Sequence, residues 1–589
     1  MIRLLDSFDI FVYLACLLLL VFSSFVSVRR GRSAAGYFMA DRALRWWSVA
    51  GSIYGTNVSL SQIIGMLGIG YSIGFAQSHY ELLAIPAILA LVYLFIPVYR
   101  QANFFTLSEY LAERYDDRAR LLYTLAIMAI ILILLVGGLY IGSRQLGLLF
   151  RDTPLQPTYL QGILLIAAAS CLLTFFGGME AVVKAENIIT VLMVLAVLTV
   201  GWCTLRQPSI GGLFGLLELD ASSDRGLHKM RLYLPSNHPD LPWTGVFSGL
   251  LVLHGFFWTT NQFEVQRVLA ARTDRDAQLG AIGAGFLKLT IPFFSIAAGV
   301  AAAYLFRYEY DLADVKPDDA FVMLLSKVVP SGYGLMGLIL AGFTGAVFSS
   351  MYSMLNSAAT ISSVDLYRRY VHPLAADARL VWIGRISVLG ITLLASILAW
   401  LSFDPNADGN FFLTLSRNSS YLKPGIVSAF FLGVVWKRTH PASAAPVMLA
   451  APFLGLGIEW FYAEVLANDP FWIDLFGPRL NFLHRVFAVF VLCLGLQVFL
   501  SLRMPAPEKF SETLQLALPW MHIFMFILMQ VIILWLIRKG VYTAASMAMP
   551  AAVASLLLWQ AGRRQRWNAV NFWGALLAAF TLWALYRFV

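Results

Sequence analysis

Residues 52–71 read SIYGTNVSLSQIIGMLGIGY, a stretch long enough to cross a lipid bilayer but poorly suited to one continuous helix. Its centre carries the polar side chains of Thr56, Asn57 and Gln62, and glycines flank them at irregular spacing. We predict that a membrane helix breaks near residues 55–58 and frees backbone carbonyl and N–H groups. A broken helix is tolerated in a membrane only where it lines a cavity or faces other protein, so the stretch is a candidate binding site. The alternative is an unbroken helix whose glycines let a neighbour pack closely.

The composition of the chain indicates a polytopic membrane protein. Of its 589 residues, 59% are hydrophobic and 13% are charged, which would leave a water-soluble protein with extensive exposed apolar surface. A net charge of +9 could point to nucleic acid, but the basic residues form short clusters between apolar runs. That pattern is typical of cytoplasmic loops and indicates a lipid bilayer, with no nucleic-acid partner. The cysteines lie in apolar runs without paired spacing, so neither a disulfide framework nor a zinc site is indicated.

The apolar segments predict an all-α protein with about sixteen transmembrane helices. The first segment lacks a long basic region and a cleavage site, so we interpret it as a retained helix and not a signal peptide. The predicted spans are residues 8–28, 47–74, 78–98, 119–149, 158–177, 180–205, 243–270, 277–306, 332–365, 378–403, 408–435, 443–464, 481–502, 517–538, 541–561 and 568–588.

The distribution of Lys and Arg orients these spans. If the spans alternate, basic clusters such as those at residues 29–32, 114–120 and 437–438 fall on one side, and the loops between them at 75–78 and 404–410 contain no Lys or Arg. The clustered side is cytoplasmic by the positive-inside rule. This orientation predicts a protein of the cell membrane with its N-terminus outside. The C-terminus and the two longest loops are then also external.

Three further polar features lie within predicted spans, where a strongly polar side chain is costly and indicates function. Glu81 lies near the start of the third span and Lys288 lies within the eighth, although either could extend to the lipid headgroups. Ser349, Ser353 and Ser357 recur at every fourth residue, which places their hydroxyls on one helix face. The alternative for the serines is a small-residue packing interface.

These features are consistent with a bound sodium ion. Na⁺ is a hard cation that prefers oxygen ligands; a broken helix supplies carbonyl oxygens, and a facing helix supplies hydroxyls. Transporters with discontinuous helices hold their coupling ions in this way, near the middle of the membrane and beside the substrate. We therefore predict a sodium site between residues 52–71 and the serine-bearing helix.

Several collinear motifs resemble those of the sodium:solute symporter family, to which the sodium/glucose and bacterial sodium/galactose symporters belong. The resemblance implies a five-plus-five inverted-repeat (LeuT-type) core at residues 47–435, with repeats at about 47–205 and 243–435. Residues 1–46 would then form an extra helix and loop, and residues 436–589 accessory helices. The motifs are GYFMADRALRWWSVAGSIYGTNVSLSQIIGMLGIGYSIGF (36–75), FTLSEYLAERY (105–115), GGMEAVVKAENII (177–189), WTTNQFEVQRVLAAR (258–272), FSSMYSMLNSAATISSVDLY (348–367) and SSYLKPGIVSAFFLGVVWKR (419–438).

The resemblance also implies ligands for the sodium ion. In the family, two carbonyls at the first helix break, one carbonyl on the eighth core helix and two hydroxyls beside it bind sodium. A carboxylate implicated in sodium coupling matches Glu186, whose alternative role is that of an interfacial glutamate. The matching sodium ligands in this chain are Gly55, Val58, Ala346, Ser349 and Ser350.

For the solute the resemblance is partial. Gln62, Glu81 and Lys288 match polar groups that bind sugar hydroxyls in the sugar symporters. Other sugar-contacting positions are occupied here by Ala84, Leu134, Ser416 and His254. Together with neighbouring side chains, and with Arg417, whose planar guanidinium suits a carboxylate, the candidate solute-binding residues are Asn57, Gln62, Tyr80, Glu81, His254, Phe257, Trp258, Lys288, Ser416 and Arg417.

The sequence thus predicts a sodium-coupled symporter that imports a small polar solute, most simply a sugar or polyol, by alternating access. Arg417 keeps a second substrate class open, namely an acidic sugar or organic anion. A transporter-like channel or sensor is a further alternative. No enzyme is indicated, because the spans contain no nucleophile–base pair and no H-E-x-x-H motif.

Overall fold

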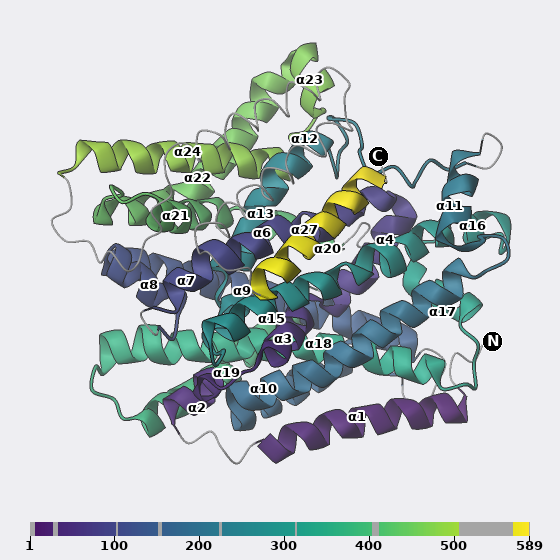
Figure 1. Ribbon diagram of the computed structural model, residues 1–589, viewed down its shortest axis with the longest axis horizontal. Coiled ribbons are helices and arrows are strands. Elements are labelled where there is room, and N and C mark those ends of the chain that lie inside the picture. Colours follow the sequence, from purple (N-terminus) through teal and green to yellow (C-terminus); the bar gives the residue numbers. More distant parts are fainter. Residues whose placement is uncertain are drawn as a thin grey trace. The chain divides into compact units, whose positions relative to one another are not determined.

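The regular structure of the described residues is helical (Figure 1). By internal contacts the chain forms two compact units that interleave along the sequence; unit 1 is Met1–Ser78, Ile127–Met230 and Leu287–Ser416, and unit 2 is His79–Ala126, Arg231–Phe286 and Arg417–Val589. The predicted division at residues 46 and 435 separates a transporter core from flanking helices along the sequence and does not concern these contact-based units. It stays a prediction. The computed structural model describes residues 6–27, 33–101, 104–150, 156–222, 226–312, 315–317, 319–402, 411–505 and 569–587.

Unit 1 contains the helices that surround the opening stretch. They are α1 (Ser7–Ser27), α2 (Ala34–Met39), η1 (Ala40–Arg42), α3 (Trp46–Asn57), α4 (Leu60–Ser72), η2 (Phe75–Ser78), α10 (Tyr159–Leu205), α11 (Gly212–Ala221), η6 (Pro292–Ile296), α16 (Ala297–Tyr308), α17 (Ala320–Val328), α18 (Leu335–Thr360), η7 (Ile361–Val371) and α19 (Asp377–Leu401). Helix α10 packs along both α3 and α18, and this trio forms the centre of the unit.

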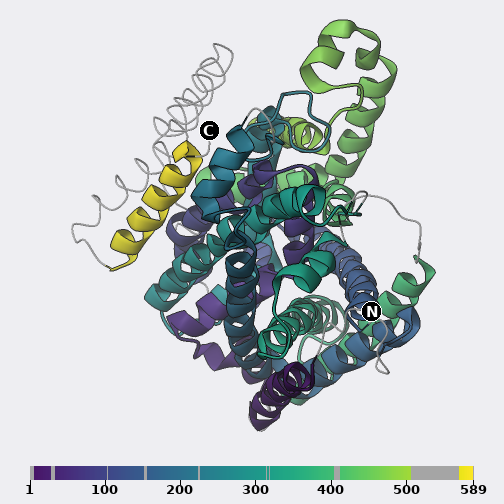
Figure 2. The same cartoon turned by 90° about the vertical axis from the view of Figure 1, so that its right-hand side faces the viewer.

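Unit 2 contains α5 (His79–Leu82), α6 (Ala84–Ala90), η3 (Leu91–Phe95), α7 (Ile96–Tyr99), α8 (Leu107–Arg114), α12 (Trp243–Gly245), η4 (Val246–Leu250), α13 (Leu251–Gly255), η5 (Phe256–Thr260), α14 (Gln262–Leu269), α21 (Lys423–Val435), η8 (Pro441–Ser443), α22 (Ala444–Glu464), η9 (Leu466–Asn468), α23 (Pro470–Phe476), α24 (Phe482–Arg503) and α27 (Ala569–Arg587). Helices α9 (Asp117–Leu149), α15 (Asp274–Lys288) and α20 (Phe411–Ser419) contribute to both units. The light-green helices α22 and α24 pack side by side (Figures 1 and 2).

Eight helices of the described residues are long and apolar enough to cross a membrane. The predicted count of about sixteen spans is larger for a physical reason. Broken helices fall into short pieces that are each too short to span, and the predicted spans 158–177 and 180–205 correspond to two helices that share the label α10 and meet at a kink at Gly178 (φ +58°, ψ −160°). The spans predicted at 517–538 and 541–561 lie outside the described residues, and the one at 568–588 corresponds to α27.

The predicted break in residues 52–71 is confirmed. Helix α3 ends at Asn57, Val58 and Ser59 leave the helical conformation, and α4 begins at Leu60. The Ser59 hydroxyl accepts a hydrogen bond from the backbone N–H of Gln62 at 3.2 Å. Ser59 is therefore the N-cap of α4, which explains why the chain restarts a helix immediately after the break.

Two further predicted spans are also broken, and the sequence analysis did not predict these breaks. Residues 243–270 form a helix that ends at Thr260, followed by extended Asn261 and then α14. The carbonyls of Thr259 and Thr260, next to the break, accept hydrogen bonds from the hydroxyls of Tyr99 and Tyr123, each at 2.8 Å. Tertiary partners thus satisfy backbone groups that a continuous helix would have paired internally.

The second of these corrected spans, residues 408–435, consists of α20 and α21 with a turn between Ser419 and Lys423. Pro424 occupies the first turn of α21, where its missing N–H costs nothing. The sequence alone did not distinguish a proline that starts a new helix from one that bends a continuous helix.

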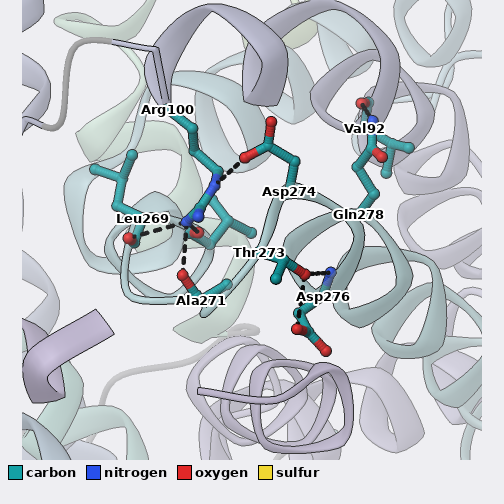
Figure 3. A network of polar contacts seen from close by, with 9 residues as sticks. Val92, Arg100, Leu269, Ala271, Thr273, Asp274, Asp276 and Gln278 are labelled. Atoms are coloured by element: carbon teal, nitrogen blue, oxygen red, sulfur yellow. Dashed lines mark hydrogen bonds and ion pairs between the residues drawn. The ribbon is translucent and has the colours of Figure 1, made fainter. Parts of the chain in front are cut away.

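Arg100, which directly follows α7, completes the far end of α14 (Figure 3). Its guanidinium donates to the carbonyls of Val268, Leu269 and Ala271 at 2.9–3.2 Å and to the carboxylate of Asp274 at 2.6 Å. A cation at the C-terminus of a helix satisfies its unpaired carbonyls and complements the helix dipole.

The long loop at residues 206–242 contains α11 and is hydrogen-bonded to the end of α4. The carboxylate of Asp220 accepts hydrogen bonds from the backbone N–H groups of Lys229 and Met230 and from the Tyr304 hydroxyl, at 2.6–2.9 Å. The Lys229 ammonium in turn donates to the carbonyls of Tyr71 and Ser72 at the end of α4. The loop therefore caps the second half of the broken helix.

We expect Asp220→Ala to destabilise the protein by at least about 2 kcal/mol, because it leaves buried donors without an acceptor. Thermal unfolding of the purified protein in detergent would measure this loss. Glu218→Ala, an exposed acid on the same helix, is the matched control and should change stability by less than about 0.5 kcal/mol. Equal effects of the two substitutions would contradict the role assigned to Asp220.

Candidate sodium and solute site

A buried carboxylate connects the three central helices of unit 1. Glu186 on α10 is fully buried and accepts hydrogen bonds from the hydroxyls of Ser52, Thr56 and Ser353. Ser52 and Thr56 belong to α3, Ser353 belongs to α18, and the Thr56 and Ser353 hydroxyl oxygens lie 2.7 Å apart. A carboxylate in a buried position is costly unless polar groups replace its water, and these hydroxyls do so.

Gly55 permits the close approach of these helices. A Cβ atom at this position would lie 3.0 Å from the hydroxyl oxygens of Ser349 and Thr190 and 3.2 Å from the carbonyl oxygen of Glu186. Those distances are too short for a side chain without movement of its neighbours. Thr190 also donates to the carbonyl of Gly51 at 2.6 Å, so α10 is bonded to α3 on both sides of Ser52.

The predicted sodium ligands on α3 and α18 come together. The Ser349 hydroxyl donates to the carbonyl oxygen of Gly55 at 2.7 Å, and the Ser350 hydroxyl donates to that of Thr56 at 3.3 Å. Val58 is buried at the break, and Ala346 is buried one turn before Ser350. The structure thus places hydroxyl oxygens of α18 against the last carbonyls of α3, as the sequence predicted for this pair of helices.

This arrangement contains oxygen atoms that the sequence analysis did not assign to the site. Ser52 and Thr190 were not among the predicted ligands, and neither was the carbonyl of Thr56, to which Ser350 donates. The signal for them was spacing, because Ser52–Thr56 and Glu186–Thr190 are each four residues apart on one helix face. Carbonyl, hydroxyl and carboxylate oxygens are the ligands that hard cations prefer.

Lys288 lies at the helix break and not at the membrane surface. Its side chain is only 2% exposed, and its ammonium donates to the side-chain oxygen of Asn57, the last residue of α3, at 2.6 Å. The alternative in which Lys288 extends to lipid headgroups is therefore wrong. Gln62, in the first turn of α4, is also buried. Unit 1 thus places three of the candidate solute-binding residues at the same break.

The remaining candidate solute-binding residues, apart from Ser416, belong to unit 2. Glu81 is fully buried on α5, so it too does not extend to the headgroups. The rings of Tyr80 and His254 lie 6.3 Å apart, and those of Phe257 and Trp258 lie 5.9 Å apart. These aromatic groups gather around α5, α13 and η5.

Ser416 and Arg417 lie in the last turn of α20. Arg417 is exposed, and its positive charge lies within electrostatic range of the Glu459 carboxylate on α22. This position favours the structural interpretation of Arg417 over a direct contact with solute.

Broken helices with buried oxygen-rich ends are the defining feature of secondary transporters whose ion and substrate sites lie at the breaks. Residues 37–450 match the sequence profile of the sodium:solute symporter family. The chain belongs to this family, and Na⁺ is its coupling ion.

Individual proteins support the same assignment. The chain is 30% identical to the sodium/glucose cotransporter of Vibrio parahaemolyticus, over 72% of this chain and 79% of that one. It is also 30% identical to sodium/myo-inositol cotransporter 2 of Sus scrofa, over 76% of this chain and 69% of that one. The solved structure of a Na⁺-coupled sialic acid symporter in a substrate-bound, outward-open state superposes with a TM-score of 0.72 at 19% identity, covering 86% of this chain and 100% of that one. The predicted fold class and sodium symport are confirmed.

We expect Glu186→Gln to raise the Na⁺ concentration required for half-maximal transport by at least about fivefold. The amide keeps the shape of the side chain but removes the negative charge that faces the hydroxyl oxygens, so a cation there loses attraction. Sodium-dependent uptake into proteoliposomes would measure the effect. Glu180→Gln, which alters a surface pair with Lys184 on the same helix, should leave the sodium dependence unchanged, and an unchanged value for Glu186→Gln would refute the role.

Proposed function

We propose that this symporter imports a sugar or polyol together with Na⁺. The observation that carries the proposal is the contact between Lys288 and Asn57 at the helix break, with Gln62 in the following turn. These groups offer both donors and acceptors in a buried place, and a polyol needs both to replace its water. The names of the glucose and myo-inositol relatives favour the same substrate class.

In this proposal, sodium binds among the oxygen atoms of α3 and α18. The backbone carbonyls of Gly55, Val58 and Ala346 and the hydroxyls of Ser349 and Ser350 are the ligands. The hydrogen bonds from the Ser349 and Ser350 hydroxyls to the carbonyls of Gly55 and Thr56 support this site, because a hydroxyl that turns its proton away presents a lone pair beside a carbonyl oxygen. Glu186 lies on the adjacent helix and couples the ion to the position of α10.

Binding of the ion favours the conformer that also binds solute. Sodium that enters from outside joins the end of α3 to α18, which orders the break where the solute residues lie. Since both ligands then stabilise the same state, each raises the affinity of the other by the same factor. A membrane potential adds about 2.3 kcal/mol per charge for each 100 mV and drives the cation inward. In the orientation predicted from the basic clusters, the N-terminus lies outside the cell.

A second candidate substrate is an acidic sugar or organic anion. Arg417 offers a planar fork that suits a carboxylate, and the structural neighbour is named as a sialic acid symporter. We favour the neutral solute, because Arg417 lies near Glu459 and three polar side chains at the break already suit a polyol.

Ser350→Ala is expected to raise the sodium concentration for half-maximal uptake, because the ion loses one of few oxygen ligands. The measurement is uptake as a function of Na⁺ in proteoliposomes with matched protein content. Ser387→Ala is the control, since the hydroxyl of this serine on α19 donates, among the described residues, to the carbonyl of Ile383 on its own helix. An unchanged sodium dependence in a well-folded Ser350→Ala protein would remove Ser350 from the site.

One competition experiment distinguishes a neutral sugar or polyol from an acidic sugar or organic anion as the substrate. Neutral sugars and polyols, acidic sugars and organic acids would be tested as competitors of Na⁺-driven uptake in the wild type and in Arg417→Lys. We expect neutral compounds to compete and Arg417→Lys to keep most of the activity. Competition by a carboxylate sugar but not by its neutral parent, with loss of activity in Arg417→Lys, would establish the anion instead.

A further inference from the structure

The turn between α20 and α21 leaves backbone carbonyls without helical partners inside an apolar segment. Irregular backbone at membrane depth persists only where other protein groups satisfy it. Helix α24 supplies such a group to the Arg417 carbonyl, which also accepts a hydrogen bond from the local Ser420 hydroxyl at 2.6 Å. Arg485 on α24 is 3% exposed, and its guanidinium donates to the carbonyl of Arg417 at 3.4 Å and to the hydroxyl of Ser420 at 2.9 Å.

The same guanidinium is held from the other side. It donates to the Tyr421 hydroxyl at 2.5 Å and to the Glu459 carboxylate at 2.6 Å, and its central carbon lies 3.7 Å from the centre of the Tyr421 ring. Tyr421 also donates to Glu459 at 2.5 Å. Arg485 therefore bridges the turn, which carries Ser420 and Tyr421, to a carboxylate on α22.

We propose that Arg485 is a positioning residue for transport, which fixes the direction in which α20 leaves the turn. Ser416 lies in the last turn of α20, so the inference about solute affinity rests on the proposed sugar or polyol transport and on the predicted role of Ser416 as a solute contact. The accessory helices then serve the transport core directly, by holding the end of one of its broken helices.

Arginine is required here for a geometric reason. Its acceptors are a backbone carbonyl, two hydroxyls and a carboxylate, and a planar fork with five N–H groups can reach them together. A lysine ammonium keeps the charge opposite Glu459 but is a single point donor. Arg485→Lys therefore removes the planar donor group but keeps the positive charge, so its effect reports on the donor geometry alone.

Arg114 provides a matched control at the other end of α21. It is buried on α8 and donates to the carbonyls of Gly433, Trp436 and Thr439 at 2.8–3.2 Å. Arg114→Lys removes a comparable fork at the C-terminal end of α21, away from the turn and from Ser416.

Hydrogen–deuterium exchange of the intact protein in lipid nanodiscs, with Na⁺ alone, tests the positioning role without any solute. In Arg485→Lys we expect exchange about fivefold faster in residues 413–423, with little change in α22. In Arg114→Lys the faster exchange should fall at residues 433–439. Faster exchange spread evenly over α21, α22 and α24 in Arg485→Lys would overturn the proposal.

Transport kinetics supply the functional measurement, with labelled D-glucose and labelled myo-inositol as probes at saturating Na⁺. Arg485→Lys should raise the apparent KM about threefold or more at a retained maximal rate per folded molecule, and Arg114→Lys should leave KM unchanged. A normal KM with only a reduced protein amount would show that Arg485 is merely structural. If the wild type takes up neither probe, the sugar or polyol proposal fails, and the exchange measurement still decides the role of Arg485.

Discussion

Backbone groups that are freed where a membrane helix breaks or ends must find hydrogen-bond partners, and several buried polar contacts among the described residues meet that requirement. The ends of four helix segments are completed by cations from elsewhere in the same unit. The side chains of Lys229, Arg100, Arg485 and Arg114 donate hydrogen bonds to carbonyls at the ends of α4, α14, α20 and α21, respectively. Each cation lies at a helix C-terminus, where unpaired carbonyls and the helix dipole both favour positive charge.

The carbonyls at the break between α3 and α4 are satisfied differently, by serine hydroxyls. Ser349 and Ser350 donate to the last carbonyls of α3, and Lys288 contacts the Asn57 side chain. Hydroxyls differ from guanidinium groups because they can turn from donor to acceptor. An end that is satisfied by hydroxyls can therefore exchange those hydrogen bonds for a cation and recover them afterwards, whereas an end capped by arginine cannot. In this respect the first break differs from the four ends that are completed by cations and resembles the break at Asn261, where tyrosine hydroxyls donate to the freed carbonyls.

The partners of the functional residues explain how much of the site could be predicted. The break near Val58 could be predicted from the sequence because glycine and polar residues interrupt an apolar run. The family motifs pointed to Ser349 and Ser350. The break at Asn261 could not be predicted in this way, because its freed carbonyls are satisfied by Tyr99 and Tyr123, which lie far away in the sequence. The break after α20 was missed for the same reason, since Glu459 and Arg485, which contact the turn, belong to α22 and α24, later in the sequence.

The sequence by itself determined the membrane setting, the helical class, the family and the first helix break, because these depend on composition and on local patterns of apolar and polar residues. Only the tertiary structure decided which oxygens meet. It joined Ser52, Thr56 and Ser353 to Glu186, and it buried Lys288 against Asn57. The physical reason is that hydrogen bonds between helices depend on how closely the helices approach. That approach is set by small residues such as Gly55 on the facing surfaces, and not by the spacing of polar residues along the chain.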